Sequence, residues 1–291
     1  MAHLRNLGIV VGTRCTFDCK HCLLAKQTRN QSLMMQEKNL LRGVVKDYAP
    51  AAILFTGGET TLYIDDINLI SSAHPRLNKT KIGVVTNGGF ASSFLEARRV
   101  LSSIYALSHV QLSYDKFHAE FLPKSHITNV RRACNDLGIG FRVISTLQSP
   151  LDLAIVGELK RLGSFKIGIQ KICDIGEAKR NAVAFRHFEF DKKVLRKFCP
   201  NRTQIVYHCG LGFSICCSNL IYNGKYPCLH KTPAEHMKSG FYKLMRATSF
   251  GRLVKDFGVR RENLLPEHSS ECALCEHLFR TTGIIKACLN K

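Results

Sequence analysis

The sequence predicts an α/β fold: an open, partial (β/α)6 barrel followed by a small cysteine-rich extension. From residue 6 to about residue 172, short apolar runs alternate with helix-length amphipathic segments, a pattern typical of βα units around a parallel sheet. The six repeats of this unit are too few to close an eight-stranded barrel. After Lys171 the alternation stops. We therefore expect a barrel domain over residues 1–185 and an extension over residues 186–291.

The strands of the barrel are predicted from apolar runs of strand length. These runs are Asn6–Val11, Ala51–Thr56, Lys81–Thr86, His109–Tyr114, Gly140–Thr146 and Phe165–Lys171. The helices between them are predicted from apolar residues that recur at intervals of three and four positions. These helices are Gln36–Tyr48, Ile64–His74, Ala91–Ser103, Ile127–Leu137 and Leu151–Leu162.

The extension is predicted to combine a hairpin with helices. Asn223-Gly224 lies between apolar residues and is a strong turn signal, which indicates a hairpin formed by Gly212–Leu220 and Ile221–Cys228. Two later segments have the length and pattern of helices. They are Pro233–Thr248 and Glu271–Ala287.

The composition excludes several classes of protein. With 45% hydrophobic residues among 291, the chain can bury a sizeable core and is not intrinsically disordered. Its longest apolar runs, such as Ala51–Phe55, are strand-sized, whereas a membrane-spanning helix needs about 20 apolar residues. The first residues lack the pattern of a signal peptide. We therefore expect a cytoplasmic protein whose 13 cysteines are metal ligands or catalytic groups rather than a disulfide framework.

The charge is strongly basic. The chain has 42 Lys and Arg against 22 Asp and Glu, a formal net charge of +20, and the segment Lys160–Arg202 is especially basic. Such an excess favours anionic partners, so nucleic acid, an acidic peptide and a phosphorylated small molecule all fit. A solvated basic surface without a partner is the plainer alternative.

Polar and cysteine-bearing segments follow four of the predicted strands. They are Cys15–Cys22, Thr56-Gly57-Gly58-Glu59, Thr86-Asn87-Gly88 and Ser113-Tyr114-Asp115. Because the carboxyl ends of parallel strands meet at one edge of an α/β fold, we expect these segments to face a single cavity.

The first of these segments contains the spacing C-x3-C-x2-C, formed by Cys15, Cys19 and Cys22. Three thiolates on one loop can hold one metal centre. A structural zinc site takes four protein ligands, and His21 could be the fourth. A [4Fe–4S] cluster is normally held by cysteines, so a loop with three leaves one iron open to an external ligand.

These motifs resemble those of the radical SAM superfamily over roughly residues 6–180. The resemblance implies a TIM-like partial (β/α)6 barrel, a [4Fe–4S] cluster on the three cysteines, bound S-adenosylmethionine, and a flavodoxin- or ferredoxin-type electron donor. It also implies that the Glu59 carboxylate receives the amino group of the cofactor and that His21 packs on the adenine. The further cofactor contacts that it implies are Thr56, Gly57, Gly58, Thr86, Asn87, Ser113 and Asp115.

The sequence departs from the family pattern at three positions. Thr60 stands where the glycine-glycine-glutamate motif normally ends in proline. Gly176-Glu177-Ala178 resembles a family loop that is commonly Gly-Arg-Ala, and here Glu177 replaces the arginine. The arginine that pairs with the methionine carboxylate in many relatives is missing, and its stretch offers only Lys116 and Lys124. Which cation takes that role is left open.

A second group of cysteines lies in the extension. Cys209 and Cys228 flank the predicted hairpin, and Cys272 and Cys275 form a C-x2-C, so four thiolates could converge on a closed site. Zinc would also suit such a site, and so would plain core packing. The arrangement resembles the twitch form of the SPASM extension, which implies a second, auxiliary [4Fe–4S] cluster. Cys216 and Cys217 compete with Cys209 for one ligand position.

Two residues near the predicted cavity are candidate catalytic groups. Cys173 follows the sixth strand and could donate a hydrogen atom to a substrate radical, and His118 could act as a base. Cys134 and Cys288 are better explained by packing, because unpaired cysteine is among the most buried residue types.

The resemblance implies an enzyme that cleaves S-adenosylmethionine reductively and abstracts a substrate hydrogen, and an auxiliary cluster favours net oxidation. We expect oxidative modification of a ribosomally made peptide. An acidic segment of this peptide would bind to the basic chain. The alternative is dehydrogenation of a small anionic or sugar-like alcohol, as in the similar 2-deoxy-scyllo-inosamine dehydrogenase. A zinc-bearing nucleic-acid-binding module is more remote, since the chain has no recognisable nucleic-acid motif.

Overall fold

The computed structural model describes residues 4–24, 30–222 and 228–281. Its first part consists of six βα units, as the sequence predicts, and the predicted α/β class is confirmed. The strands of these units are β1 (Asn6–Gly12), β2 (Ala52–Gly57), β3 (Lys81–Thr86), β4 (Leu107–Ser113), β5 (Gly140–Leu147) and β6 (Lys166–Lys171). The helices are α1 (Met35–Tyr48), α2 (Ile64–Ser71), α3 (Phe94–Ser102), α4 (Lys124–Asp136), α5 (Leu153–Arg161) and α6 (Gly176–Arg180).

The later part of the chain adds two strands and several short helices. The strands are β7 (Ile205–His208) and β8 (Gly212–Ser214). The helices are α7 (Asn219–Tyr222), α8 (Pro233–Lys238), α9 (Gly240–Ala247), α10 (Phe250–Asp256) and α11 (Glu271–Thr281). Among the described residues no helix is long and apolar enough to cross a membrane.

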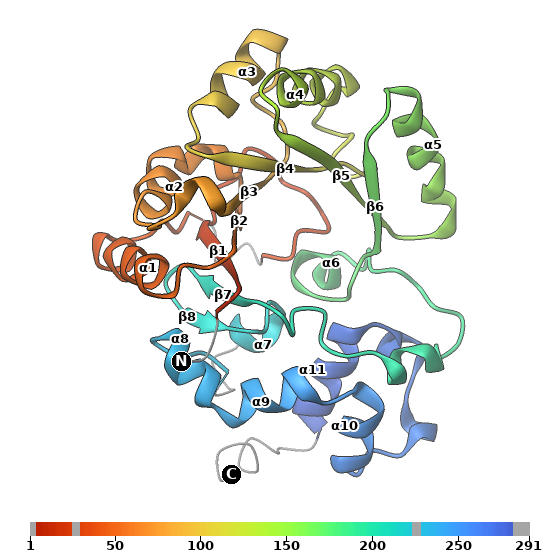
Figure 1. Cartoon of the computed structure of the whole chain (residues 1–291). Helices are drawn as coiled ribbons and strands as arrows, with labels where there is room; N and C mark the ends of the chain where they lie inside the picture. Colours follow the sequence, from red (N-terminus) through yellow and green to blue (C-terminus); the bar gives the residue numbers. More distant parts are fainter. Residues whose placement is uncertain (1–3, 25–29, 223–227, 282–291) are drawn as a thin grey trace.

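The sheet is continuous from the barrel into the extension. Its strand order is β6-β5-β4-β3-β2-β1-β7-β8; every pair is parallel except β7 with β8. Helices α1 to α5 lie outside the curved sheet (Figure 1). Helices α8 to α11 lie together below β7 and α6 in this view. The division at residue 185 stays a prediction, and β7 and β8 of the proposed extension pair onto the edge of the barrel at β1.

The predicted hairpin is wrong in position. Only Gly212–Ser214 of the proposed segments forms a strand; Leu220 and Ile221 lie in α7, and the predicted Asn223-Gly224 turn is outside the described residues. The hairpin instead joins β7 to β8, because the four residues of β7 are all buried against β1. Its turn uses the positive φ of Gly210, 74°, which glycine adopts without strain.

Two hydrophobic cores support the molecule. The larger core lies between the strands and α1 to α5, and it extends to Tyr207 and Phe213 of the β7–β8 hairpin. The smaller core is built by α7, α9, α10 and α11 around residues such as Phe241 and Phe250. The cysteine-bearing part of the extension therefore has its own apolar environment.

The buried carboxylate of Glu37 fastens α1 to the β7–β8 hairpin. Its Oε1 accepts hydrogen bonds from Tyr207 Oη at 2.5 Å and from the Gly210 backbone amide at 2.8 Å. Its Oε2 accepts one from the Met34 amide at 2.8 Å. Burial, together with the neighbouring Glu37, raises the pKa of Tyr207, so the phenol stays a neutral donor.

Replacing Glu37 with alanine should destabilise the fold, because it leaves the Tyr207 hydroxyl and the Gly210 amide without their acceptor. We expect a loss of about 2 kcal/mol or more in the free energy of unfolding of the metal-free protein. Glu96→Gln is the control, since Glu96 pairs with Arg99 on an exposed helix face, where such pairs contribute about 0–1 kcal/mol. Chemical denaturation measures both, and equal losses would contradict this role of Glu37.

Candidate functional site

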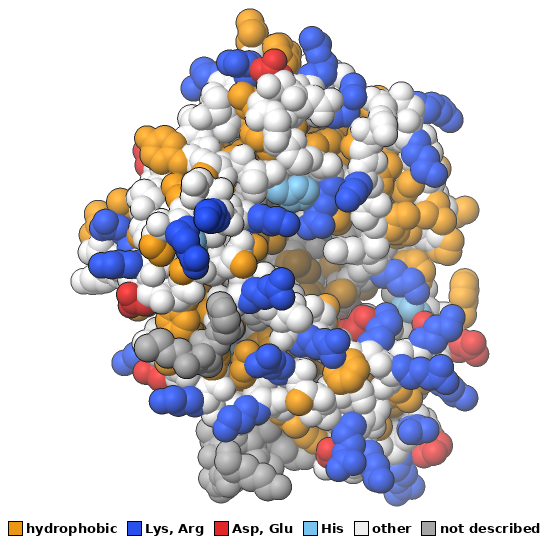
Figure 2. Space-filling model, in the orientation of Figure 1, with side chains coloured by type: hydrophobic (Ala, Val, Ile, Leu, Met, Phe, Trp, Pro, Cys, Tyr) orange, Lys and Arg blue, Asp and Glu red, His pale blue; other side chains and the backbone are white. Residues whose placement is uncertain are grey.

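The three cysteines of the first motif lie on the loop between β1 and α1, in residues 13–24. Cys15 is exposed, and Cys19 and Cys22 are half-buried. The Cys22 amide donates a hydrogen bond to the Cys19 carbonyl at 3.2 Å, which makes a tight turn between the two. In the orientation of Figure 1, the middle of this face is hollowed, and Lys and Arg side chains predominate around the hollow (Figure 2).

The glycine pair after β2 allows close contact between two backbone segments. A Cβ atom at Gly57 would lie 2.2 Å from the Gly12 carbonyl oxygen, and one at Gly58 would lie 1.9 Å from the Arg14 carbonyl oxygen. The Gly58 amide donates to the Gly12 carbonyl, and the Glu59 amide donates to the Arg14 carbonyl. The glycines therefore bring the end of β2 against the start of the cysteine loop.

Glu59 joins the ends of β2 and β3. Its buried carboxylate accepts hydrogen bonds from Thr86 Oγ1 at 2.6 Å, from the Asn87 amide at 2.7 Å, and from the amide and hydroxyl of Thr61. Thr60, at the position of the expected proline, is buried and donates its hydroxyl to the Val85 carbonyl at 2.8 Å. The sequence pattern did not predict this internal network.

Asn87 connects β3 to the cysteine loop. Its Nδ2 lies 3.0 Å from Thr16 Oγ1 and 3.6 Å from Cys15 Sγ, and its Oδ1 accepts from the Gly89 amide. Burial raises the pKa of Cys15, opposed by a backbone hydrogen bond at Phe17 and reinforced by the charge of Glu59. A positive metal centre on this thiolate would therefore offset both the burial and the nearby carboxylate.

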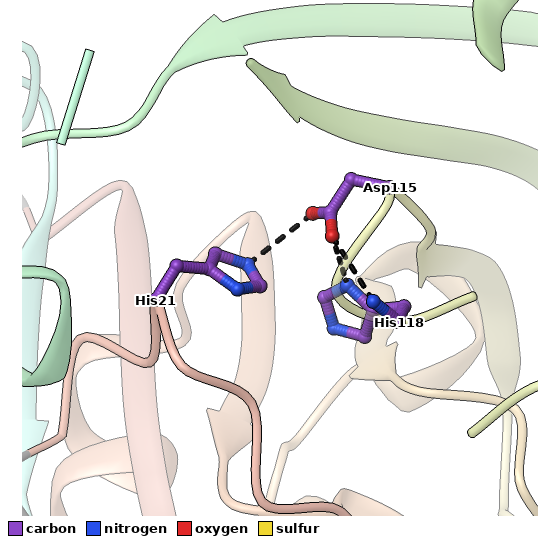
Figure 3. A group of neighbouring side chains, drawn as sticks. All are labelled: His21, Asp115 and His118. Atoms are coloured by element: carbon purple, nitrogen blue, oxygen red, sulfur yellow. Dashed lines mark hydrogen bonds and ion pairs between the residues drawn. The ribbon is translucent and has the colours of Figure 1, made fainter. Parts of the chain in front are cut away.

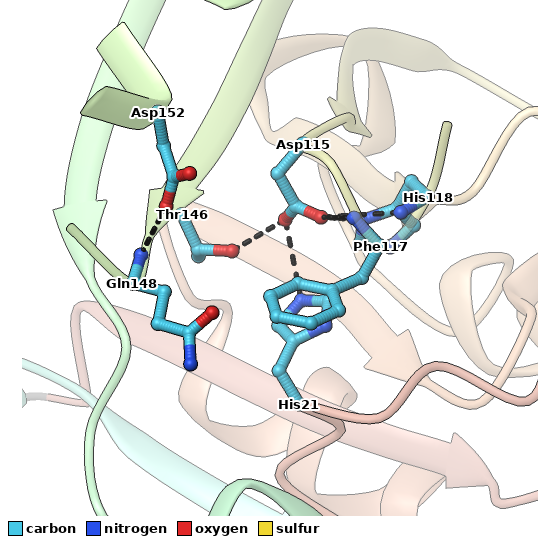
Figure 4. Close-up of polar contacts among 7 residues, drawn as sticks. All are labelled: His21, Asp115, Phe117, His118, Thr146, Gln148 and Asp152. Atoms are coloured by element: carbon cyan, nitrogen blue, oxygen red, sulfur yellow. Dashed lines mark hydrogen bonds and ion pairs between the residues drawn. The ribbon is translucent and has the colours of Figure 1, made fainter. Parts of the chain in front are cut away.

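Asp115, at the end of β4, binds two histidines (Figure 3). His21 Nε2 lies 3.2 Å from Oδ2, and His118 Nδ1 lies 3.0 Å from Oδ1. Thr146 Oγ1 also donates to Oδ2, and the amides of Phe117 and His118 donate to Oδ1 (Figure 4). Burial alone would raise the pKa of Asp115, but the hydrogen bonds and charges of His118 and His21 outweigh burial and hold the pKa far below its usual range.

These three side chains are close enough to form a group: their candidate ligand atoms lie within 4.8 Å of one another. The structure thus brings His21, Asp115 and His118 together, although the sequence pattern gave them separate roles. Thr56 and Ser113 are half-buried at the ends of β2 and β4.

Helix α6 supports the cysteine loop from the other side. The Glu177 amide donates to the Cys22 carbonyl at 2.9 Å, and Asn181 Nδ2 donates to the Lys20 carbonyl at 2.9 Å. Gly176 has a φ of +57°, and a Cβ there would lie 2.3 Å from the Leu23 carbonyl oxygen. Asn181 is a site residue that the sequence motifs did not identify.

The two lysines considered for a cofactor carboxylate are both in ion pairs. Lys116 Nζ lies 3.2 Å from Asp152 Oδ1, and Lys124 Nζ lies 2.6 Å from Glu158 Oε2. Lys124 is on the exposed side of α4. Neither ion pair identifies Lys116 or Lys124 as the partner of the cofactor carboxylate.

In the extension, the structure brings a different set of cysteines together from the predicted one. Cys199, Cys216, Cys217, Cys272 and Cys275 line one mainly apolar pocket. Cys228 belongs to the same hydrophobic core as Cys216 and Cys275, whereas Cys209 lies in the larger core beside Glu37. The structure does not bring Cys209 to the other predicted ligands.

The thiols of this cluster influence one another. Burial raises the pKa of Cys216, and the charges of Cys217 and Cys228 raise it further. Burial likewise raises the pKa of Cys199 to about 11. Deprotonated thiols are thus disfavoured here unless a cation accompanies them.

Cys173 lies at the junction of the two parts. Its thiol forms a hydrogen bond with Cys272, which raises the pKa of Cys272 and lowers that of Cys173. It therefore belongs with the cysteines of the extension rather than with the polar side chains at the ends of β2 to β4. Cys134 lies in the larger core as expected, and Cys288 is outside the described residues.

Two buried histidines, His208 and His236, and the half-buried His230 support the segment that carries Cys216. His208 Nε2 lies 2.9 Å from the Cys216 carbonyl, and His236 Nε2 accepts from the Ile215 amide at 2.8 Å. His230 Nδ1 lies 3.0 Å from His236 Nδ1. Burial lowers the pKa of His236 to about 3, so its ring is a neutral acceptor. These histidines are spread along the sequence and showed no motif.

Comparison with known proteins agrees with this geometry. Residues 9–148 match the model of the radical SAM superfamily. The candidate peptide biosynthesis protein YydG of Bacillus subtilis (strain 168) is 24% identical over 309 residues, covering 95% of this chain and 92% of that protein.

Two solved structures are also similar. Native anSMEcpe with bound AdoMet and Cp18Cys peptide has a TM-score of 0.54 at 13% identity and covers 97% of this chain and 99% of its own. Streptococcus suis SuiB bound to precursor peptide SuiA has a TM-score of 0.48 at 16% identity and covers 85% and 68%. The matched residues include the cysteine loop and the polar strand ends, so residues 9–148 form a domain of the radical SAM superfamily of enzymes.

Proposed function

We propose that this chain uses radical SAM chemistry to modify a ribosomally made peptide oxidatively. The observation that carries the proposal is the loop of Cys15, Cys19 and Cys22, fixed at the carboxyl ends of the strands by Asn87 and by α6. When bound there, a [4Fe–4S] cluster and S-adenosylmethionine supply the electron and the 5′-deoxyadenosyl radical that removes a hydrogen atom from the substrate.

The residues present suit such a cluster. Three thiols on one tight loop supply soft ligands and leave one iron without a protein ligand. Asn87 Nδ2 lies beside the Cys15 sulfur, where a hydrogen bond stabilises a thiolate. The chain therefore holds the thiols on a loop that Asn87 and α6 support.

The strand ends provide the walls of the cofactor site. Thr56 and Ser113 remain available to a ligand at half-buried positions. The Glu59 carboxylate already accepts hydrogen bonds from Thr61, Thr86 and Asn87. We therefore assign to Glu59 chiefly the role of holding the neighbouring backbone. The half-buried backbone of Gly57 and Gly58 is assigned the direct contact with the cofactor.

Two observations support a peptide as substrate. The relative YydG is named for peptide biosynthesis and is aligned over 95% of this chain. The formal net charge of +20 favours an acidic segment, and basic side chains surround the hollow in Figure 2.

We also propose that the extension holds an auxiliary [4Fe–4S] cluster, with a ligand set revised from the sequence pattern. Cys272 and Cys275 remain ligands, and the other two come from Cys199, Cys216, Cys217 and Cys228. Cys209 is left out because it lies in the other core. The convergence of thiols in a mainly apolar pocket supports this assignment.

Cys19→Ala should abolish the formation of 5′-deoxyadenosine, because two thiolates cannot hold the cluster in a state that binds the cofactor. Chromatography of anaerobic reactions with reductant and S-adenosylmethionine measures the product. Cys134→Ala is the control, since Cys134 lies in the larger core on α4, and it should keep the activity. Cofactor cleavage by the Cys19 variant would contradict the assignment of this loop.

Iron content separates the two possible sets of auxiliary ligands. The reconstituted protein should contain roughly eight irons per chain, and Cys272→Ala roughly four. Cys209→Ala should keep the full content under the revised set, whereas the set read from the sequence predicts a loss. Cys272→Ala should still cleave S-adenosylmethionine, without forming product. Normal turnover by this variant would rule out a role for an auxiliary cluster.

The substrate class is tested by offering the reconstituted enzyme any short peptides that are encoded beside the gene, together with sugar-like alcohols. Mass spectrometry should find a peptide that has lost hydrogen. Oxidation of an alcohol with all peptides unchanged would overturn the peptide proposal. Colourless protein with stoichiometric zinc would overturn the radical chemistry itself.

A further inference from the structure

We propose that Asp115 is a positioning residue that acts through His21: it fixes the imidazole ring and, through it, the loop that carries Cys19 and Cys22. This role differs from the expectations from the sequence, in which Asp115 contacts the cofactor and His118 acts as a base. The proposal rests on the proposed function in taking the loop thiols as cluster ligands.

The Asp115 carboxylate has no capacity left for a ligand. Oδ1 receives the Phe117 amide at 3.0 Å and the His118 amide at 3.2 Å, and the His118 ring nitrogen lies 3.0 Å away without hydrogen-bond geometry. Oδ2 receives the Thr146 hydroxyl and His21 Nε2. Because a carboxylate offers about four lone-pair sites, these four donors, two on each oxygen, occupy both oxygens (Figure 4). A cofactor would have to break one of these contacts to reach Asp115.

The carboxylate is the polar anchor of the His21 ring. Nδ1 of His21 is buried and has no hydrogen-bond partner among the described residues, so Nε2 carries the polar contact. The Phe117 ring stacks on His21 with centroids 4.7 Å apart, and the His118 ring meets it edge-on at 5.1 Å. One turn after β4 thus supplies a charge and two rings to the same imidazole (Figure 4).

The position of His21 in the chain transmits this constraint to the thiols. It stands directly before Cys22, whose amide donates to the Cys19 carbonyl. On the other side of the loop, the Glu177 amide and Asn181 hold the carbonyls of Cys22 and Lys20. The loop is therefore held by its backbone at α6 and by the His21 side chain at β4.

The neighbouring surface contact cannot replace this anchor. Lys20 Nζ lies 3.7 Å from Glu120 Oε1, and both side chains are about half exposed or more, at 60% and 47%. Exposed ion pairs contribute little, while a buried, charged hydrogen bond contributes more. Glu120→Gln is accordingly a matched control, since it alters a contact to the same loop from the same segment.

The first experiment uses the cluster-free protein and follows the alkylation of Cys22 by iodoacetamide with peptide mass spectrometry. Asp115→Ala should raise the rate about tenfold, because loss of a charged hydrogen bond releases the loop. Asp115→Asn should have a smaller effect, since the amide keeps one acceptor. Glu120→Gln should stay within about twofold of the wild type. An unchanged rate in Asp115→Ala would overturn the proposal.

The second experiment is a double-mutant cycle with His21→Phe, which keeps a ring against Phe117 but removes the contact to Asp115. If Asp115 acts through His21, Asp115→Asn should change the alkylation rate and the electron paramagnetic resonance spectrum of the reduced cluster only when His21 is present. Equal effects of Asp115→Asn with and without His21 would overturn the proposal and support direct cofactor contact.

The two experiments separate this inference from the proposed function. Should the wild-type protein hold no cluster, the radical chemistry fails, yet alkylation of the cluster-free variants still decides whether Asp115 fixes the loop. Should Asp115→Ala not fold, the Asp115→Asn cycle gives the same decision. Steady-state kinetics adds a further readout: a positioning role predicts a lower kcat with a nearly unchanged KM for S-adenosylmethionine, whereas direct contact raises KM.

Discussion

The close backbone contact between the chain leaving β1 and the end of β2 is the constraint on which the site depends. It requires glycine at positions 57 and 58, because a Cβ at either would collide with the carbonyl oxygen of Gly12 or Arg14. Once the backbones touch, the Glu59 carboxylate reaches Thr86 and Asn87 at the end of β3. The start of the cysteine loop is thereby placed beside two strand ends.

The far end of the same loop is held by residues that come much later in the chain. Asp115 engages the His21 side chain, and α6 engages the backbone around Cys22. A loop that must present three thiols to one metal centre needs both ends fixed, because the ordering entropy of a loose loop opposes metal binding. The fold provides this support with buried hydrogen bonds rather than exposed ion pairs.

Buried hydrogen bonds also hold the cysteine-bearing extension in place, through other residues. The β7–β8 hairpin continues the main sheet and is fastened to α1 by Glu37. The thiols lie beyond it in a separate apolar core, where neutral histidines such as His236 hold the backbone near Cys216. The hairpin therefore links the two cores, and its own Cys209 remains on the barrel side.

The sequence by itself determined the six βα units, the three-cysteine loop and the strand-end motifs. These features are local: apolar periodicity marks each element, and the order of strands in a parallel α/β fold places their carboxyl ends together. The hairpin was mislocated because Asn223-Gly224 is a strong local signal, whereas β7 is a strand through its pairing with β1. Propensity yields to such tertiary pairing in short segments.

Only the tertiary structure decided which side chains share partners. The His21 contact to Asp115, the support from Asn181 and the separation of Cys209 from Cys275 all join or divide positions that are distant in sequence. Cysteine spacing states which thiols are neighbours along the chain, but not which core each thiol enters. That choice follows from how β7 packs on β1 and how α11 packs on α10, interactions that sequence spacing does not encode.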